Sequence, residues 1–200
     1  RRHFSERVGT PVSAVLFSDD METDRGWQVE HEATSGRWQR AEPRGTWLGA
    51  IPVQPDEDAS PTGRLAFVTG NAGTMPRDDD VDAGTTRLVS PLLDASSFVS
   101  LELRYARWLY REGPATAPED ASGLIVEVSD DGGESWVLVE VAAEDVGGWI
   151  EVHRDLDPLV VPAERLRLRV SAVDLTRDYD RIVEAALDEV VIEGFELVCD

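Results

Sequence analysis

Carboxylates gathered in two loops and one strand are the residues of this chain whose chemistry best suits a metal ion. Acidic side chains fill residues 19–24 (DDMETD) and 78–82 (DDDVD), and Asp188 interrupts the apolar stretch 182–192 (IVEAALDEVVI). Calcium takes six to eight oxygen ligands from carboxylates, carbonyls and water, and flexible loops rich in aspartate and glycine supply them. Because a buried carboxylate without a partner is strongly unfavourable, Asp188 needs an arginine, a backbone donor or a metal ion.

We therefore predict a structural calcium ion. In a jelly roll the first and last strands lie together, which would bring residues 20–22 toward Asp188, and the loop 70–84 would add its own carboxylates. The predicted ligands are the carboxylates of Glu22, Asp80, Asp82 and Asp188, with Asp20 in reserve and a carbonyl from Gly84. Scarce imidazole and sulfur disfavour zinc. The alternative is that these are solvated acidic loops, which the net charge of -21 favours.

Catalytic signatures are missing from the sequence. His3, His31 and His153 are too scattered for a zinc motif, and HEATS at residues 31–35 lacks the second histidine of HExxH. No GxSxG, P-loop or dinucleotide-binding glycine pattern occurs. Carboxylate pairs are unavoidable among 40 acidic residues, so they do not single out a glycosidase. We therefore expect that the chain is not itself an enzyme.

Composition and length indicate one domain of a longer protein. The 200 residues contain no long linker, so we expect a polar lead-in over residues 1–11 and a single domain over residues 12–198. The net charge and a pI near 4.4 argue against nucleic acid or an anionic membrane as partner. The sequence contains no apolar run of about 18 residues, so we expect no membrane insertion. Cys199 is the only cysteine, so no internal disulfide forms; a free thiol is expected, and the alternatives are a partner outside this segment or an inert residue.

Alternation of polar and apolar residues predicts an all-β chain. Strands are expected at residues 12–17, 27–32, 36–40, 64–69, 85–91, 98–110, 123–129, 135–141, 149–154, 165–173 and 182–192. The segments 27–32 and 36–40 should form a hairpin, and the proline-rich segment 41–63 should be a long surface loop. In the last strand, Ile182, Ala186, Val190 and Ile192 should share one face with Glu184 and Asp188. These signals together indicate an antiparallel β-sandwich of the jelly-roll type.

One turn carries a recognisable motif. The residues SDDGGESW at 129–136 fit the Asp-box pattern, with Ser129, Asp131, Gly133 and Trp136 at its expected positions. Asp-boxes occur in sialidases and in many other β proteins. We interpret this one as a turn that satisfies its own hydrogen bonds, with Trp136 as its plug, rather than as a ligand site.

Charged and aromatic residues on strand faces suggest a second candidate site. If three of the expected strands are neighbours, one sheet face would gather Glu102, Arg104, Trp108, Arg167, Arg169 and Glu184. The functional interpretation is a platform for a sugar, whose apolar face stacks on an aromatic ring while its hydroxyls form hydrogen bonds. The alternative is a ladder of cross-strand ion pairs that contributes only to the sheet.

Four segments together give the chain a family resemblance. The segments DDMETDRGW (19–27), TTRLVSP (85–91), SDDGGESW and IVEAALDEVVI, in this order, resemble the MAM domain family over residues 15–195. More narrowly, they resemble the MAM-like jelly-roll modules attached to secreted bacterial metallopeptidases of the immune inhibitor A kind. Met21 stands where the family usually has phenylalanine, and Glu189 replaces the second aspartate of the usual pair. The cysteines of animal MAM domains are missing, which favours the bacterial branch.

The resemblance implies a noncatalytic, secreted or cell-surface module. Such a module serves adhesion, carbohydrate contact or support of a neighbouring enzyme domain. Its expected partners are neighbouring domains of the parent chain, which would be a metallopeptidase, and a glycan or a cell-surface protein. Two other functions stay open, a polysaccharide-acting hydrolase and a structural spacer of a surface adhesin.

Overall fold

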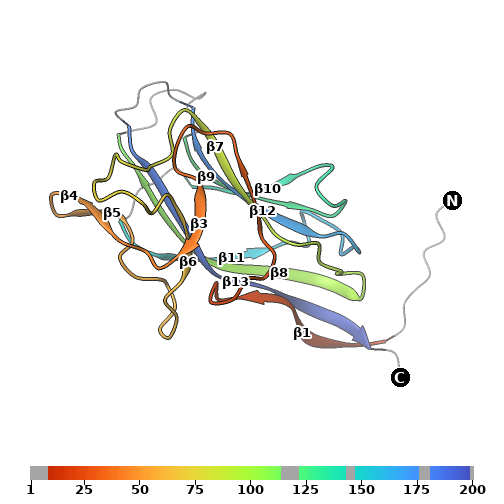
Figure 1. Cartoon of the computed structure of the whole chain (residues 1–200). Helices are drawn as coiled ribbons and strands as arrows, with labels where there is room; N and C mark the ends of the chain where they lie inside the picture. Colours follow the sequence, from red (N-terminus) through yellow and green to blue (C-terminus); the bar gives the residue numbers. More distant parts are fainter. Residues whose placement is uncertain (1–8, 114–121, 143–146, 176–180, 199–200) are drawn as a thin grey trace.

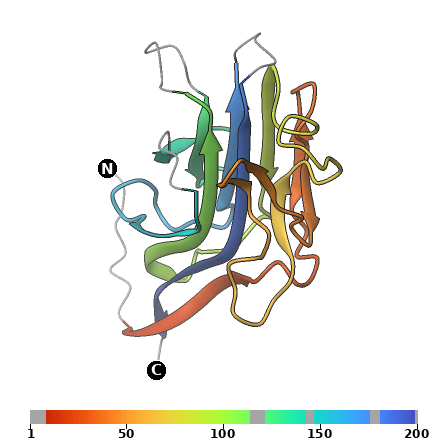
Figure 2. The ribbon, with the colours of Figure 1, turned by 90° about the vertical axis from the view of Figure 1, so that its left-hand side faces the viewer.

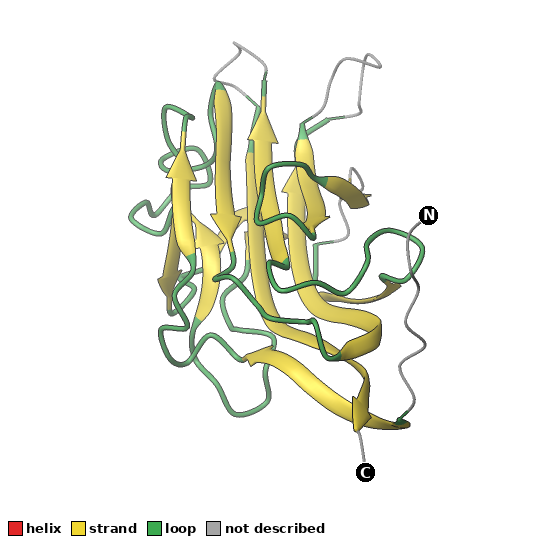
Figure 3. Ribbon diagram, turned by 90° about the vertical axis from the view of Figure 1, so that its right-hand side faces the viewer, coloured by secondary structure: helices red, strands yellow, loops and turns green. Residues whose placement is uncertain are grey.

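The computed structural model describes residues 9–113, 122–142, 147–175 and 181–198, and for these residues it confirms the predicted all-β fold. Figure 1 labels most of the strands, and Figure 3 shows them joined by loops alone. The strands are β1 (Thr10–Asp19), β2 (Gln28–His31), β3 (Trp38–Ala41), β4 (Thr46–Leu48), β5 (Ile51–Gln54), β6 (Ala66–Thr69), β7 (Gly84–Val89), β8 (Phe98–Arg111), β9 (Gly123–Ser129), β10 (Val137–Ala142), β11 (Ile150–Asp155), β12 (Arg167–Asp174) and β13 (Val183–Val198). None of the described residues forms a helix long and apolar enough to cross a membrane.

Two antiparallel sheets form the sandwich. Sheet A has the order β11-β8-β13-β6-β3, with β1 paired to β13, and sheet B has the order β10-β9-β12-β7-β2. The first and last described strands run side by side, from Thr10 opposite Val198 to Asp19 opposite Val190. Figure 1 shows these two strands as a ribbon along the lower edge of the molecule. The predicted neighbourhood of first and last strands is therefore confirmed.

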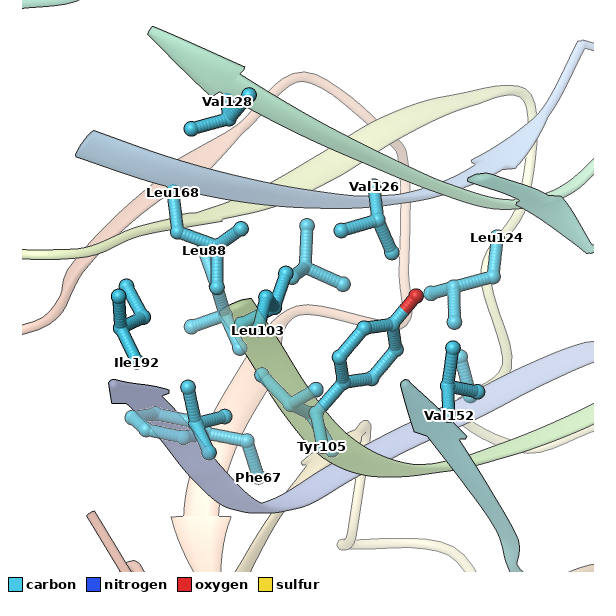
Figure 4. Packing of buried hydrophobic residues seen from close by; sticks show 14 of the residues in the cluster. Phe67, Leu88, Leu103, Tyr105, Leu124, Val126, Val128, Val152, Leu168 and Ile192 are labelled. Carbon is cyan, nitrogen blue, oxygen red and sulfur yellow. The ribbon is translucent and has the colours of Figure 1, made fainter. Parts of the chain in front are cut away.

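The core lies between the inner faces of the two sheets (Figure 4). Leu103 comes from β8 in sheet A, while Val126 and Leu168 come from β9 and β12 in sheet B, and each is at most 1% exposed. Their strands alternate as the sequence predicts, so these side chains point inward. Burial of such apolar surface is the main force that holds the two sheets together.

A bulge in β13 makes the predicted faces of this strand wrong beyond Asp188. The pairing with β8 shifts between Asp188 and Val191, and Glu189 takes a left-handed φ of 51°. An extra residue reverses the alternation of side chains. As a result, Val190 and Ile192 join Leu187 in the core, on the face opposite to the one predicted.

The segments 27–32 and 36–40 do not form the predicted hairpin. β2 pairs with β7 in sheet B, whereas β3 pairs with β6 in sheet A, so the chain crosses from one sheet to the other between them. Gly36 allows this crossing, because it has a φ of 73° and any Cβ would lie 2.5 Å from the backbone of Val81. The indole Nε1 of Trp38 then donates to the carbonyl of Thr86 at 3.0 Å and ties the two sheets together.

The segment 41–63 is more than the predicted surface loop. It contains the β4–β5 hairpin, which lies against the outer face of sheet A, the face turned away from the core (Figure 2). Trp108 and Tyr110 of β8, which alternation along the strand places on this outer face, are therefore only 6% and 5% exposed. The indole of Trp108 donates to the carbonyl of Val53 in β5 at 2.8 Å.

Candidate functional site

The predicted calcium ligands do not converge on one ion. Asp80 lies at one end of β13, where its Oδ2 accepts a hydrogen bond from the backbone N–H of Val183 at 3.2 Å. Asp188 lies five residues further along the same strand, which is about 16 Å at the usual rise per residue. One ion cannot bind both carboxylates. In the parts of the chain that the structure describes, no three side chains of the types His, Cys, Asp and Glu form a group that could hold a metal.

Asp80 and Asp82 form one of the two resulting acidic groups. Asp80 is 2% exposed, and its burial, together with the nearby charge of Asp82, raises its pKa to about 7. The hydroxyl of Ser35 lies 2.6 Å from the carbonyl of Asp80 and 2.9 Å from the carboxylate of Asp82. Gly84 is paired with Asp174 at the start of β7, so its carbonyl belongs to this end of the molecule.

Asp188 belongs to the second acidic group, beside the loop that follows β5. It is fully buried, and its carboxylate accepts backbone hydrogen bonds from Ala59 at 2.9 Å and from Glu189 at 2.8 Å. Burial raises its pKa to about 7 despite these hydrogen bonds. Backbone donors therefore supply the partner that the sequence analysis requires for this carboxylate.

Glu22 is bound to the same loop from the other side. Its Oε1 accepts hydrogen bonds from the backbone N–H groups of Arg64 and Leu65, both at 2.7 Å. These bonds hold the pKa of the Glu22 carboxyl below its usual value. Asp20 is exposed, and its Oδ1 accepts from the N–H of Glu22 at 3.2 Å. Glu22 thus fixes the loop in place near β1, while Asp20 accepts only a local hydrogen bond from the backbone of Glu22.

The six residues predicted to share one sheet face lie on two different sheets, so this prediction is wrong. Arg167 and Arg169 belong to β12 in sheet B. Arg169 pairs with Glu127 at 2.6 Å and lies 4.2 Å above the ring of Trp136, as expected for a cross-strand ion pair with a cation–π contact. For Arg169 on sheet B, the alternative of a cross-strand ion pair is therefore the correct one.

The Asp-box turn next to Arg169 satisfies its own hydrogen bonds, as predicted. The carboxylate of Asp131 accepts from the N–H and the hydroxyl of Ser135 at 2.9 and 2.6 Å, and the N–H of Gly133 donates to Ser129 Oγ at 2.8 Å. The bonds from Ser135 lower the pKa of Asp131 well below its ordinary value. The turn is therefore complete without a ligand.

Two of the predicted residues on sheet A are out of reach of a ligand. Glu184 is 3% exposed and accepts a hydrogen bond from the hydroxyl of Thr69 at 2.6 Å. Burial raises its pKa well above the usual value for a glutamate. Trp108 lies beneath β5 as described above. Local alternation places both on the outer face, but it cannot show that the β4–β5 hairpin covers them.

A hollow of about 330 Å³ remains open on the outer face of sheet A, beside that hairpin. Figure 2 looks onto this face. The hollow is lined from β8, β13, β11 and the loop after β5, by Ala59, Pro61, Arg104, Tyr105, Ala106, Trp149, Glu151, Glu189 and Val191. Of the predicted ligand-binding residues, only Arg104 lines it. The bulge at Glu189 turns Val191 toward the hollow, so the same irregularity that changes the core face also shapes this site.

Trp149 forms an ordered aromatic wall of the hollow. Its indole Nε1 donates to the carbonyl of Glu57 at 3.1 Å, and its ring meets that of Trp108 edge-on, with centroids 6.1 Å apart and an angle of 74°. These two contacts fix the plane of a half-buried ring. The sequence analysis missed Trp149 as a site residue. The available signal was its position at the start of a strand, in phase with the outward-facing Glu151.

A second hollow of about 170 Å³ continues the first along β8 and β13. It is lined by Ser13, Ser100, Glu102, Glu193, Gly194 and Phe195. The boundary between the two hollows is the ion pair of Arg104 and Glu193, with an N–O distance of 3.0 Å. We call the two hollows together the outer groove. From Ala106 to Ser100 it follows about 20 Å of strand, and its ends carry Trp149 and the half-exposed ring of Phe195.

The outer groove has the chemistry of a saccharide site. An aromatic ring offers a surface on which the apolar face of a pyranose stacks. The guanidinium of Arg104 donates hydrogen bonds, and the carboxylates of Glu151 and Glu189 accept them, which matches hydroxyls that do both. The length of the groove suits several linked sugar rings rather than one.

Comparison with known proteins shows similarity at the level of the fold. No family model matches the chain, and no curated protein matches it. The K1 cleaved adhesin domain of Lys-gingipain from Porphyromonas gingivalis W83 is 14% identical with a TM-score of 0.46, over 93% of this chain and 99% of that one. TmCBM61 in complex with beta-1,4-galactotriose is 14% identical with a TM-score of 0.47, over 84% and 87%. A structure from the β-sandwich superfamily of carbohydrate-binding modules is 11% identical with a TM-score of 0.50, over 87% of this chain and 58% of that one. The last similarity supports the β-sandwich fold seen here.

Proposed function

We propose that the chain is a noncatalytic glycan-binding module. The observation that carries this proposal is the outer groove, which combines an ordered tryptophan, a guanidinium and two carboxylates in one open hollow. The β-sandwich neighbour with a TM-score of 0.50 is described as a carbohydrate-binding module with promiscuous specificity, which agrees with this use of the fold. Hydrolysis is the alternative that two carboxylates in one hollow keep open.

We also propose that the module serves a larger secreted or cell-surface protein. The segments that resemble MAM-like modules support this placement, because MAM-like modules of this kind are attached to secreted metallopeptidases of the immune inhibitor A kind. In such a protein the module would hold a neighbouring catalytic domain close to a glycan. Linkage of this kind raises the effective concentration of the substrate for the attached domain.

Trp149→Ala is expected to weaken glycan binding by roughly 10–100-fold, because stacking on an aromatic ring contributes on the order of 1–3 kcal/mol. The measurement is isothermal titration with neutral oligosaccharides such as galactotriose and xylohexaose. Trp47→Ala is the matched control, since Trp47 is 46% exposed on β4 and does not line the hollow.

Three results would contradict this proposal. Equal losses in the Trp149 and Trp47 variants would mean that the groove is not the binding site. Shortened oligosaccharides after incubation, abolished by Glu151→Gln or Glu189→Gln, would favour the hydrolase. Failure of the protein to bind any glycan would favour a structural spacer.

A structural calcium ion beside Asp188 is a separate proposal, because the other predicted ligands, Asp80 and Asp82, lie too far away to share it. We propose that the carboxylate of Asp188 supports an ion together with carbonyls of the adjacent loop, and the ion would offset the like-charge repulsion of Asp188 by Glu189 and Asp58. Thermal melts should then show a higher midpoint in calcium than in excess chelator, and Asp188→Asn should remove the difference. Equal melting midpoints of the unmodified protein in calcium and in chelator would contradict the proposed ion.

A further inference from the structure

The outer groove is lined by more carboxylates than cationic groups. Glu151 and Glu189 line the first hollow, and Glu102 and Glu193 line the second. Asp155 lies opposite Glu102 in the β11–β8 pairing, on the same face of β11 as Glu151. Five carboxylates therefore follow the groove from one end to the other.

Positive charge in the groove is scarce and already paired. Arg104 is the only arginine among the described residues that line the two hollows, and it pairs with Glu193. The sequence contains no lysine. His153, opposite Arg104 on β11, lies 3.2 Å from the carboxylate of Glu151. With a net charge of -21 for the whole chain, the potential along this face is negative.

We propose that the outer groove binds glycans that carry free amino groups, an inference that rests on the glycan-binding function proposed above. Protonated amines near Glu151 and Glu189 form charge-assisted hydrogen bonds, while the ring that carries them stacks on Trp149. A glycan with carboxylates or sulfates meets charge of its own sign along the whole groove, and electrostatic complementarity of this kind sets specificity. The length of the groove lets successive amines meet successive carboxylates.

The test compares two β-1,4-linked tetrasaccharides of the same length, the tetramer of glucosamine with free amines and its fully N-acetylated counterpart. Each is titrated into the purified chain at pH 6, where the amines are protonated. The free-amine form is expected to bind about tenfold more tightly at low salt, a difference of about 1.4 kcal/mol. The difference should shrink at about 1 M salt, where the Debye length is about 3 Å.

Single charge removals locate the effect. Glu151→Gln and Glu189→Gln should each lower the affinity for the free-amine tetramer by roughly 3–10-fold, and by clearly more than they lower that for the N-acetylated tetramer, because the glutamine oxygen still accepts from hydroxyls but no longer attracts a protonated amine. Glu30→Gln is the matched control, because it removes one charge from an exposed position on β2 in sheet B. It should change neither affinity by more than about twofold, since exposed distant charges are screened.

The possible failures are distinguishable. N-acetylated tetramer bound as tightly as the free-amine form would overturn the amino preference and leave glycan binding standing. Equal affinity for tetralysine would overturn it as well, because the groove would then bind charge without a sugar. If neither tetrasaccharide nor any neutral oligosaccharide binds, the glycan-binding function itself fails.

Discussion

Glu140→Ala should lower the free energy of unfolding by about 3–5 kcal/mol, the usual cost of removing one partner of a buried ion pair. Glu140 lies on β10, and its side chain is 8% exposed. Its carboxylate accepts hydrogen bonds from the hydroxyl of Tyr105 and from the guanidinium of Arg107, the latter at 3.0 and 3.2 Å, while Arg154 reaches it at 3.3 Å. The substitution would leave the guanidinium of Arg107 buried with its negative partner removed.

The position of this network explains why its loss should affect the whole fold. Tyr105 and Arg107 come from β8 in sheet A, whereas Glu140 comes from β10 at the edge of sheet B, so the bonds cross the sandwich. Figure 4 shows the ring of Tyr105 extending from β8 toward the opposite sheet. Burial of the ring and the carboxylate of Glu140 both raise the pKa of Tyr105 far above its ordinary value, so its hydroxyl remains a donor.

Denaturant unfolding measures the effect, and two further variants interpret it. Glu42→Ala removes the carboxylate of an exposed pair with Arg64, whose side chains are 60% and 73% exposed, and should not change the midpoint. The double variant with Glu140→Leu and Arg107→Met should recover much of the lost stability, because both charges are then gone. A midpoint for Glu140→Ala equal to that of the unmodified protein would mean that the network does not join the sheets.

The sequence predicts the fold and the inward faces of most strands because both depend on local alternation. Leu103, Val126 and Leu168 are buried as their strands predict, and the Asp-box forms its own hydrogen bonds within eight residues. Such patterns need no knowledge of distant residues. They lead to a jelly-roll sandwich before any tertiary contact is considered.

The candidate site could not be predicted in the same way, because it depends on contacts between distant segments. The bulge at Glu189 changes the phase of β13 after Asp188, and nothing in the alternating pattern marks it. The β4–β5 hairpin covers Trp108 and leaves Trp149 open, although both are aromatic residues on outward faces. Which tryptophan is accessible to a ligand is therefore decided by residues 41–63, a segment whose prolines and acidic residues predict only a loop.

The same dependence on distant segments explains why the two predicted sites differ from the candidate site in the outer groove. Arg167 and Arg169 have the right alternation for an outward face, but the order of strands places that face on sheet B. Asp80 and Asp188 are predicted to bind the same ion, yet Asp80 contacts Val183 at the start of β13 and Asp188 lies five residues further along the strand. Strand order and register, which the sequence alone leaves open, decide both cases.

Leu168→Ala should lower the free energy of unfolding by about 2–5 kcal/mol, as for other fully buried leucines. Leu168 is 1% exposed on β12, the central strand of sheet B, between β9 and β7. Figure 4 shows its side chain among Val128, Leu88 and other core residues. With strands on both sides and a sheet opposite, the surrounding backbone has little freedom to close the space left by the missing methyl groups, so a cavity adds to the lost burial.

The matched variant is Leu138→Ala. This substitution removes the same atoms as Leu168→Ala, but Leu138 is 52% exposed on the edge strand β10. Its loss should be within about 0.5 kcal/mol, as for ordinary surface substitutions. Denaturant unfolding of both variants measures the two losses, and the slope of the unfolding free energy against denaturant concentration should be the same in both. A loss below about 1 kcal/mol for Leu168→Ala would mean that β12 presents its other face to the core, because a shift of one residue moves every side chain of a strand to the opposite side.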